Sequence, residues 1–87
     1  MQHLHKHLRL FEHDELEIRV TAPAHVYLVD EDNYRFYREG EEFDYYGGLV
    51  RRSPLRLRAP YAGPWHLVVE QAEPGRPLDV VVQLIQG

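Results

Sequence analysis

Short segments in which apolar and polar residues alternate constrain this chain more than any other feature of its sequence. Between His3 and Leu10, leucines alternate with histidine and arginine, which is the period-two pattern of a half-buried strand. Seven segments read as strands in this way, and they cover residues 3–10, 16–20, 25–29, 43–46, 55–59, 65–69 and 78–84. Turn signals rich in Gly and Pro separate several of them. We therefore predict an all-β fold, a small antiparallel β-sandwich of jelly-roll-like or barrel-like form, with about seven short strands.

Residues 30–42 interrupt the alternation and carry acidic, aromatic and arginine residues. A helical spacing would place Tyr34 and Tyr37 together, but the segment is short and ends at Gly40. We predict a loop here with at most one helical turn, and little or no helix elsewhere. A chain without a helix to cover an open sheet buries its apolar faces best between two sheets.

Length and composition limit the classes of function. A chain of 87 residues makes a single domain, predicted over residues 1–87. The absence of cysteine excludes disulfides, thiolate metal sites and a cysteine nucleophile. A net charge of −4 argues against nucleic-acid binding. No apolar run is long enough to span a membrane, and the first residues lack the apolar centre of a secretory signal, so we predict a cytoplasmic protein.

The segment from Tyr45 to Ser53 concentrates aromatic rings, a diglycine and an arginine pair, which is typical of a recognition loop. Arginine and tyrosine supply charge, hydrogen-bond donors and flat faces for an anion or a sugar. The alternative is structural, with one tyrosine in the core and the glycines in a bulge or tight turn. The predicted ligand-binding residues are Tyr45, Tyr46, Gly47, Gly48, Arg51, Arg52, Ser53 and His66. The predicted partner is a small polar ligand or another protein.

Three histidines at positions 3, 5 and 7 point to the same side of the first predicted strand. Together with His13, His25 or His66 they could complete a tetrahedral metal site. A polar, solvent-facing side of an edge strand explains them without a metal, and we favour this account because no carboxylate stands nearby at a recognisable ligand spacing. No nucleophile stands in position for a histidine base, because the one serine, Ser53, precedes Pro54 in a turn. We predict no catalytic residue, no metal and no cofactor, with a small histidine- or metal-dependent enzyme as the alternative.

The last predicted strand, residues 78–84, keeps apolar residues on both of its sides. Val81 lies opposite the core-facing residues, and Ile85 continues the same side. This half-apolar strand favours a contact site, so a self-association domain that forms a homodimer is a further alternative. The main prediction is a binding or interaction module without catalytic activity.

The stretch YYGGLVRRSPLRLRAPYAGPWHLVVE resembles the central and C-terminal signature of a small bacterial family, the domain of unknown function 1883. The Tyr-Tyr-Gly-Gly-Leu block, the Arg-Ser-Pro turn and the Gly-x-Trp-His motif carry the resemblance. Leu4-His5 and residues 26–34 also fit, so the similarity covers nearly the whole chain, whereas His3 and His7 depart from it. The resemblance implies a compact β-sandwich that occurs alone or joined to other modules, in some relatives a TIR signalling domain.

Overall fold

The structure is a computed structural model that describes residues 2–87. Its elements along the chain are β1 (Gln2–Leu10), β2 (Glu15–Val20), β3 (Ala24–Val29), α1 (Glu31–Arg38), β4 (Tyr46–Val50), β5 (Leu55–Arg58), β6 (Gly63–Gln71) and β7 (Val80–Ile85). Over the described residues there are seven strands and one short helix. The predicted all-β class is confirmed.

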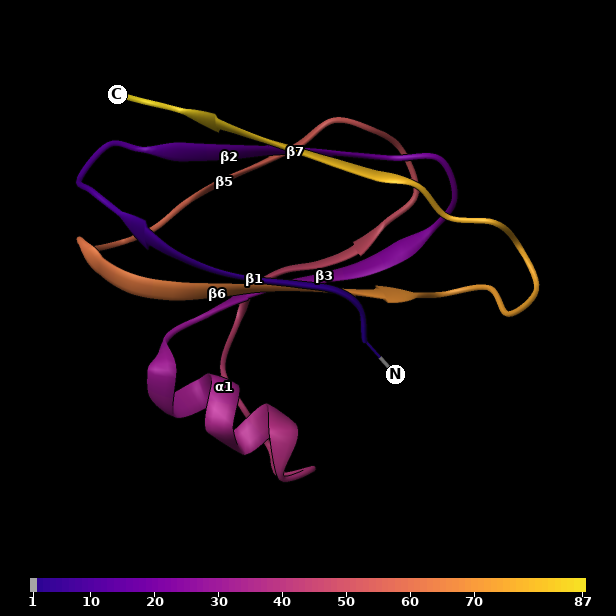
Figure 1. Ribbon diagram of the computed structural model, residues 1–87, viewed down its shortest axis with the longest axis horizontal. Helices are drawn as coiled ribbons and strands as arrows, with labels where there is room; N and C mark the ends of the chain where they lie inside the picture. Colours follow the sequence, from indigo (N-terminus) through magenta and orange to yellow (C-terminus); the bar gives the residue numbers. More distant parts are fainter. Residues whose placement is uncertain (1) are drawn as a thin grey trace.

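Two antiparallel sheets face each other as the layers of a sandwich (Figure 1). The four-stranded sheet has the order β1-β6-β3-β4, and the three-stranded sheet has the order β5-β2-β7. Between the described strands, every connection crosses from one sheet to the other except the one from β3 through α1 to β4, which stays with the four-stranded sheet. Figure 1 shows α1 on the far side of the four-stranded sheet, away from the other sheet.

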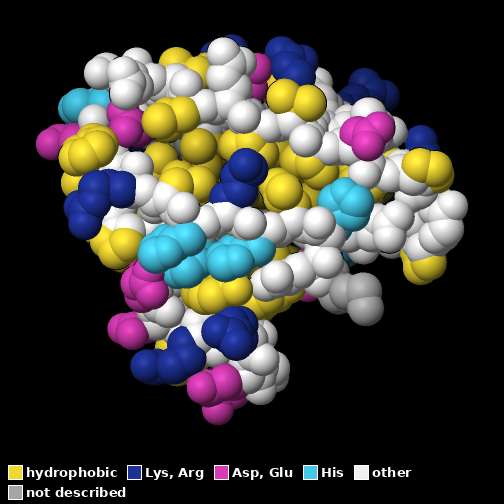
Figure 2. Space-filling view, in the orientation of Figure 1, with side chains coloured by type: hydrophobic (Ala, Val, Ile, Leu, Met, Phe, Trp, Pro, Cys, Tyr) yellow, Lys and Arg dark blue, Asp and Glu magenta, His cyan; other side chains and the backbone are white. Residues whose placement is uncertain are grey.

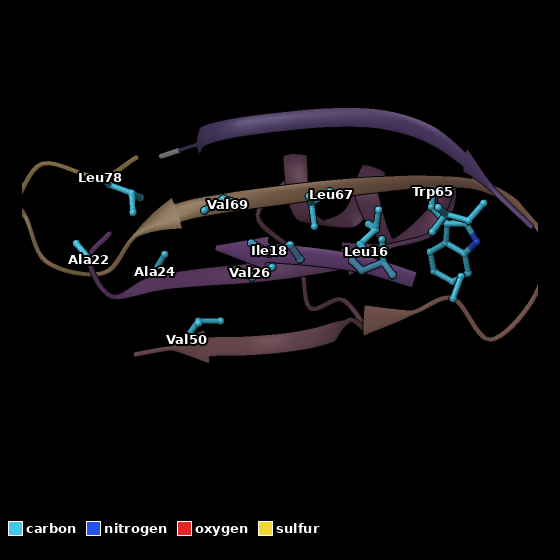
Figure 3. Close-up of a cluster of buried hydrophobic side chains, with 13 residues drawn as sticks. Leu16, Ile18, Ala22, Ala24, Val26, Val50, Trp65, Leu67, Val69 and Leu78 are labelled. Atoms are coloured by element: carbon cyan, nitrogen blue, oxygen red, sulfur yellow. The ribbon is translucent and has the colours of Figure 1, made fainter. Parts of the chain in front are cut away.

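The core fills the space between the sheets (Figure 3). Trp65 lies at one end of the sandwich and Leu78 near the other. Its members come from both sheets and from the turns between them: Leu10, Leu16, Ile18, Ala22, Ala24, Val26, Leu28, Val50, Ala59, Trp65, Leu67, Val69 and Leu78. The predicted alternation explains this set, because every second residue of a strand points to the same face.

Helix α1 is longer than the single turn that the sequence predicted. Asp30 caps its start by accepting a hydrogen bond from the Asn33 amide at 2.8 Å. Its end is closed by two backbone bonds, from Gly40 N to the Tyr37 carbonyl at 3.2 Å and from Glu41 N to the Phe36 carbonyl at 2.9 Å. Gly40 has a φ of 75°, which this ending requires and which glycine adopts without strain. Both ends are thus stabilised locally.

The expectation that no helix covers a sheet is wrong, because α1 lies over the outer face of the four-stranded sheet (Figure 1). Two tyrosines one turn apart make the contact. The Tyr34 ring stacks on His66 with centroids 4.0 Å apart, and the Tyr37 hydroxyl donates to Glu70 of β6. The helix has eight residues, and no helical segment described for residues 2–87 combines the length and apolarity that crossing a bilayer requires.

The diglycine lies within strand β4, where the sequence predicted part of a loop. Gly47 pairs with Tyr27 and Gly48 with Val26 of β3. Gly47 has a φ of 121°, and a Cβ at this position would collide with the Val26 carbonyl oxygen. Gly47 therefore permits a backbone approach that any side chain would block.

Candidate functional site

Asp30 and Glu31 are consecutive residues at the junction of β3 and α1, and they contact two different clusters. The Asp30 Oδ1 atom accepts hydrogen bonds from the Asn33 backbone and side-chain amides, at 2.8 and 3.0 Å. Its Oδ2 atom accepts a hydrogen bond from the Tyr61 hydroxyl at 3.2 Å. Glu31 instead places Oε1 2.9 Å from His66 Nε2. This junction therefore joins an aromatic cleft to a histidine cluster.

The aromatic cleft has a volume of about 340 Å³. It is lined by Leu28, Val29, Asp30, Asn33, Asp44, Tyr45, Tyr46, Tyr61 and Trp65. The Tyr46 and Tyr61 rings contact the buried Trp65 ring, with centroids 6.1 and 4.9 Å away. Trp65 Nε1 donates to the Tyr61 carbonyl at 3.1 Å, which fixes the indole. Because Tyr45, Tyr46 and Tyr61 are 47%, 48% and 51% exposed, their rings are accessible to a ligand.

The charge in the aromatic cleft has one sign. Asp30 and Asp44 line it, and among residues 2–87 no Lys, Arg or His side chain does. Desolvation acts to raise the pKa of the Asp30 carboxyl, but hydrogen bonds from Asn33 and Tyr61 outweigh it and leave that pKa below its ordinary value. Burial, and then the nearby Asp30 charge, raise the pKa of Tyr61. At neutral pH the cleft thus combines the ionised Asp30 carboxylate with the neutral Tyr61 hydroxyl.

The histidine cluster consists of His5 and His7 from β1, His66 from β6, and Tyr34 and Glu31 from α1. His66 pairs with His7 in the sheet register, and their rings stack with centroids 4.1 Å apart. On its other side, Tyr34 stacks on His66 at 4.0 Å and on His5 at 4.5 Å. Figure 2 shows histidine side chains in a row where the sheet meets the helix. Helix α1 thus converts an outer sheet face into a partly enclosed site.

Hydrogen bonds connect the cluster into one chain. The Tyr34 hydroxyl is 3.3 Å from His5 Nδ1, and His5 Nε2 is 2.8 Å from His66 Nδ1. His66 Nε2 and His7 Nε2 lie 2.9 and 2.8 Å from the same oxygen, Glu31 Oε1. One set of neutral tautomers satisfies every link: Tyr34 donates to His5, His5 to His66, and His66 to the carboxylate. His66, which is only 5% exposed, therefore has both ring nitrogens partnered.

Burial and neighbouring charge set the protonation of the cluster. Desolvation lowers the pKa of His5, and the nearby His66, His7 and Arg38 charges lower it further. The hydrogen bond from His66 is the main cause that lowers the pKa of Glu31. At neutral pH the cluster consequently holds a carboxylate beside a neutral His5.

The structure divides the predicted ligand-binding residues between two ends of the four-stranded sheet. Tyr45 and Tyr46 lie in the aromatic cleft, and His66 pairs with Val29 at the same end of β3. His66 faces α1, whereas Tyr46 packs against the Trp65 ring. The three residues are neighbours of the β3–α1 junction, but they belong to its two separate clusters.

Arg51, Arg52 and Ser53 lie at the opposite end, after Val50. Val50 pairs with Ala24, five residues along β3 from Val29, which is about 16 Å at ~3.3 Å per residue. Ser53 Oγ accepts from the Val20 amide at 2.6 Å and donates to the Val20 carbonyl at 3.0 Å. Its hydroxyl therefore bonds to the backbone of β2. The arginine pair is thus not brought to the tyrosines or to His66.

Several site residues were absent from the predicted set. Tyr61, Asp30 and Asp44 complete the aromatic cleft, and Glu31 and Tyr34 complete the histidine cluster. Most depend on α1, and its signals were present: a capping residue, acidic residues in the first turn, arginines in the last turn and a closing glycine. Giving more weight to these signals would have placed Glu31 and Tyr34 on a helix.

The fold defines this protein as a small two-sheet β-sandwich domain with one short helix over its larger sheet. The family model described as domain of unknown function (DUF1883) matches residues 1–84, so the chain belongs to this family. The resemblance seen in the sequence is confirmed. No curated protein and no solved structure matches the chain. The family description assigns no activity, so function rests on the site itself.

Proposed function

We propose that this protein is a non-enzymatic binding module that captures a small organic cation, such as a quaternary ammonium or guanidinium group, in the aromatic cleft. The observation that carries the proposal is the composition of the cleft wall. Exposed tyrosine rings surround a buried tryptophan, and both charged side chains in the lining are carboxylates. Aromatic faces attract cations through their quadrupole, and more strongly when water is partly excluded.

Charge and shape both favour a cation over an anion. An anion would face Asp30 and Asp44 with no cationic side chain in the lining to offset them. A volume of about 340 Å³ suits a compact group of a few heavy atoms. Within residues 2–87, the Asp44 carboxylate has no hydrogen-bond or ion-pair partner, so it is available to the ligand.

Recognition by the cleft needs little rearrangement. The Trp65 ring is fixed by its hydrogen bond to the Tyr61 carbonyl and by burial between the sheets. Tyr61 is further held by its hydroxyl bond to Asp30, whose carboxylate also caps α1. Groups held in place before binding lose little freedom when a ligand arrives.

Choline and its neutral isostere 3,3-dimethylbutan-1-ol provide the direct test. Titrated against the ¹⁵N-labelled protein, choline should shift the Trp65 indole resonance and those of Tyr46 and Tyr61. The neutral isostere should bind about tenfold more weakly, because it keeps the shape and lacks the charge. A peptide that carries trimethyllysine should bind more tightly than choline if the cation comes from a protein partner, and equally if it comes from a free small molecule.

Two aspartates provide matched variants of equal charge change. Asp44→Asn should weaken choline binding several-fold, whereas Asp32→Asn, on the helix and outside the cleft, should leave it unchanged. Tyr45→Leu, which removes a ring and keeps apolar volume, should also weaken it. Equal binding of choline and the isostere, or equal effects of the two aspartate variants, would refute the proposal.

A second candidate function is self-association through β7. This edge strand exposes Val81 (62%) and Leu84 (46%), and Figure 2 shows hydrophobic side chains gathered between the two layers along this open side. A dimer that buries them should dissociate in Val81→Lys. Light scattering at micromolar concentration distinguishes a monomer from a dimer. If the native protein is a monomer, self-association through β7 is refuted.

A further inference from the structure

Three side chains with metal-ligating atoms converge within the histidine cluster, from three different elements. The Nε2 atoms of His7 and His66 and a carboxylate oxygen of Glu31 all lie within 4.8 Å of one another. We infer that these three residues form a binding site for a divalent transition-metal ion of the zinc class. The inference departs from the sequence expectation of no metal, because the sequence did not reveal that α1 brings Glu31 to the histidines.

The distances need only a small expansion to accept an ion. Glu31 Oε1 is 2.8 Å from His7 Nε2 and 2.9 Å from His66 Nε2. Ligands about 2.0–2.1 Å from a tetrahedral zinc lie roughly 3.3 Å apart. The side chains of His7 and Glu31 are 55% and 53% exposed, so they can move by the few tenths of an ångström required.

Ring orientation identifies which ligand has to turn. The His7 and His66 rings are nearly parallel, with an interplanar angle of 5° and centroids 4.1 Å apart, so their nitrogen lone pairs lie in separate parallel planes. Convergence on one ion therefore requires one ring to tilt. His66 is held between β6 and α1, whereas His7 is half-exposed on the edge strand β1, so His7 is the ring that turns.

The hydrogen-bond chain behind His66 suits a metal ligand. With Nε2 on the ion, His66 carries its proton on Nδ1 and donates it to His5 Nε2, 2.8 Å away. His5 then donates from Nδ1 to the Tyr34 hydroxyl oxygen at 3.3 Å. Metal-bound histidines almost always donate their second ring nitrogen in this way, which fixes ring and tautomer. The hydrogen bonds that link His66, His5 and Tyr34 thus remain when the ion is bound, with donor and acceptor exchanged in each of them.

The ligand set and its surroundings define the class of ion and leave room for a further ligand. Two imidazoles and one carboxylate suit zinc and its neighbours in the first transition series, and they do not suit calcium or magnesium. The groove around the cluster is also lined by Arg35 and Arg38 of α1 and by Glu39, the residue that follows the helix. Three protein ligands leave a tetrahedral ion with one position for water or an exogenous group.

Calorimetric titration of zinc into untagged, chelator-treated protein tests the site. We expect one zinc ion per chain, a rise in unfolding temperature with zinc, and a zinc-edge anomalous peak between His7, Glu31 and His66. Glu31→Gln and His7→Gln change exposed side chains, so they should fold and lose more than about tenfold in zinc affinity. His5→Gln, behind His66, should lose about tenfold.

His13→Gln is the matched control, because His13 is an exposed histidine beside a glutamate, Glu12, at 3.5 Å, outside the cluster. Its zinc affinity should equal that of the native protein. Absence of stoichiometric zinc binding, or affinity unchanged in both Glu31→Gln and His7→Gln, would overturn the inference. The metal site shares no residue with the aromatic cleft. A negative zinc titration would therefore refute the metal site and leave the proposed cation binding untouched, and a negative choline titration would do the reverse.

Discussion

The two sheets of the sandwich share one core but present different outer faces. The outer face of the three-stranded sheet carries glutamates and arginines: Arg56 of β5 pairs with Glu17 of β2 and Arg58 with Glu15 across the strands, and Arg19 pairs with Glu17 within β2. The outer face of the four-stranded sheet carries His7 and His66, and Tyr34 of α1 stacks on His66. These ion pairs connect β5 to β2, whereas the rings that α1 partly covers can bind a ligand. The difference places the candidate chemistry on the larger sheet.

The edge strands β4 and β5, which follow each other in the chain, repeat this contrast. Strand β4 approaches β3 so closely that only glycine fits at position 47. Strand β5 is joined to β2 by side-chain ion pairs that leave the backbone ordinary. A substitution that blocks the close approach of β4 to β3 should therefore lower the free energy of unfolding more than one that removes an ion pair between β5 and β2.

The largest effect is expected from Gly47→Ala. The new methyl group would collide with the Val26 carbonyl oxygen, and the φ of 121° is strained for alanine. We expect a loss of more than about 2 kcal/mol in the free energy of unfolding, measured by urea denaturation followed by circular dichroism. Gly48→Ala is the matched control: its φ is 135°, but a Cβ there meets nothing within 4 Å. Equal losses for both would show that strain alone accounts for the diglycine.

A smaller effect is expected from Glu17→Gln on the three-stranded sheet. The Glu17 side chain is only 9% exposed, and Arg56 donates to its Oε2 from Nε at 3.1 Å and from NH2 at 2.9 Å. Removing the charge should cost about 1–2 kcal/mol of unfolding free energy. Glu15→Gln, whose side chain is 28% exposed and has one arginine partner, should cost less than about 1 kcal/mol. A larger loss in Glu15→Gln would contradict burial as the deciding factor.

Acid should weaken the fold through the face that α1 covers. His5 has a folded-state pKa below its ordinary value of 6.5, because burial and neighbouring cations disfavour its charged form. As pH falls through 6.5, the unfolded chain takes up a proton that the folded chain resists, so stability is full above this range and declines below it. Glu31, whose pKa is lowered from 4.5, adds a second decline at lower pH.

The measurement is the urea midpoint at pH 8 and at pH 5, with chelator present. The native protein should have the lower midpoint at pH 5, and His5→Gln should reduce the difference. His13→Gln, at an exposed turn, should keep it. A native midpoint that rises on acidification would contradict the arrangement of His5 in the cluster.

The β-sandwich could be predicted from the sequence, because the alternation of apolar and polar residues along a strand reflects which residues are buried. Leu16 and Ile18 alternate with Glu17 and Arg19, and the structure places the first pair in the core. Trp65 lies in the core, and His66, the next residue of β6, points to the outer face, where it stacks on Tyr34 of α1. Local patterns of this kind do not depend on which strands become neighbours.

The candidate site could be predicted only in part from local sequence patterns, because it depends on contacts between segments that are distant in sequence. Glu31 and His66 are 35 positions apart, and they meet because β3 pairs with β6 and α1 turns back over both. Tyr61 reaches Asp30 across 31 positions. Residues 45–53 are adjacent in sequence and looked like one site, but a strand separates their ends. Proximity along the chain therefore did not bring Arg51 and Arg52 beside Tyr45 and Tyr46 in space.

The smallest effect is expected in the connection from β4 to β5. Arg51 and Arg52 are exposed there, and the Ser53 hydroxyl is hydrogen-bonded to the backbone of Val20. Arg52→Ala should change the unfolding free energy by less than about 0.5 kcal/mol and leave choline and zinc binding unchanged, because both candidate sites lie at the other end of β3. Ser53→Ala should cost about 1 kcal/mol, because its hydroxyl bonds both the amide and the carbonyl of Val20. If Arg52→Ala abolished ligand binding with the fold intact, recognition would belong to the turn after β4, and the contrast between the two outer faces would lose its functional meaning.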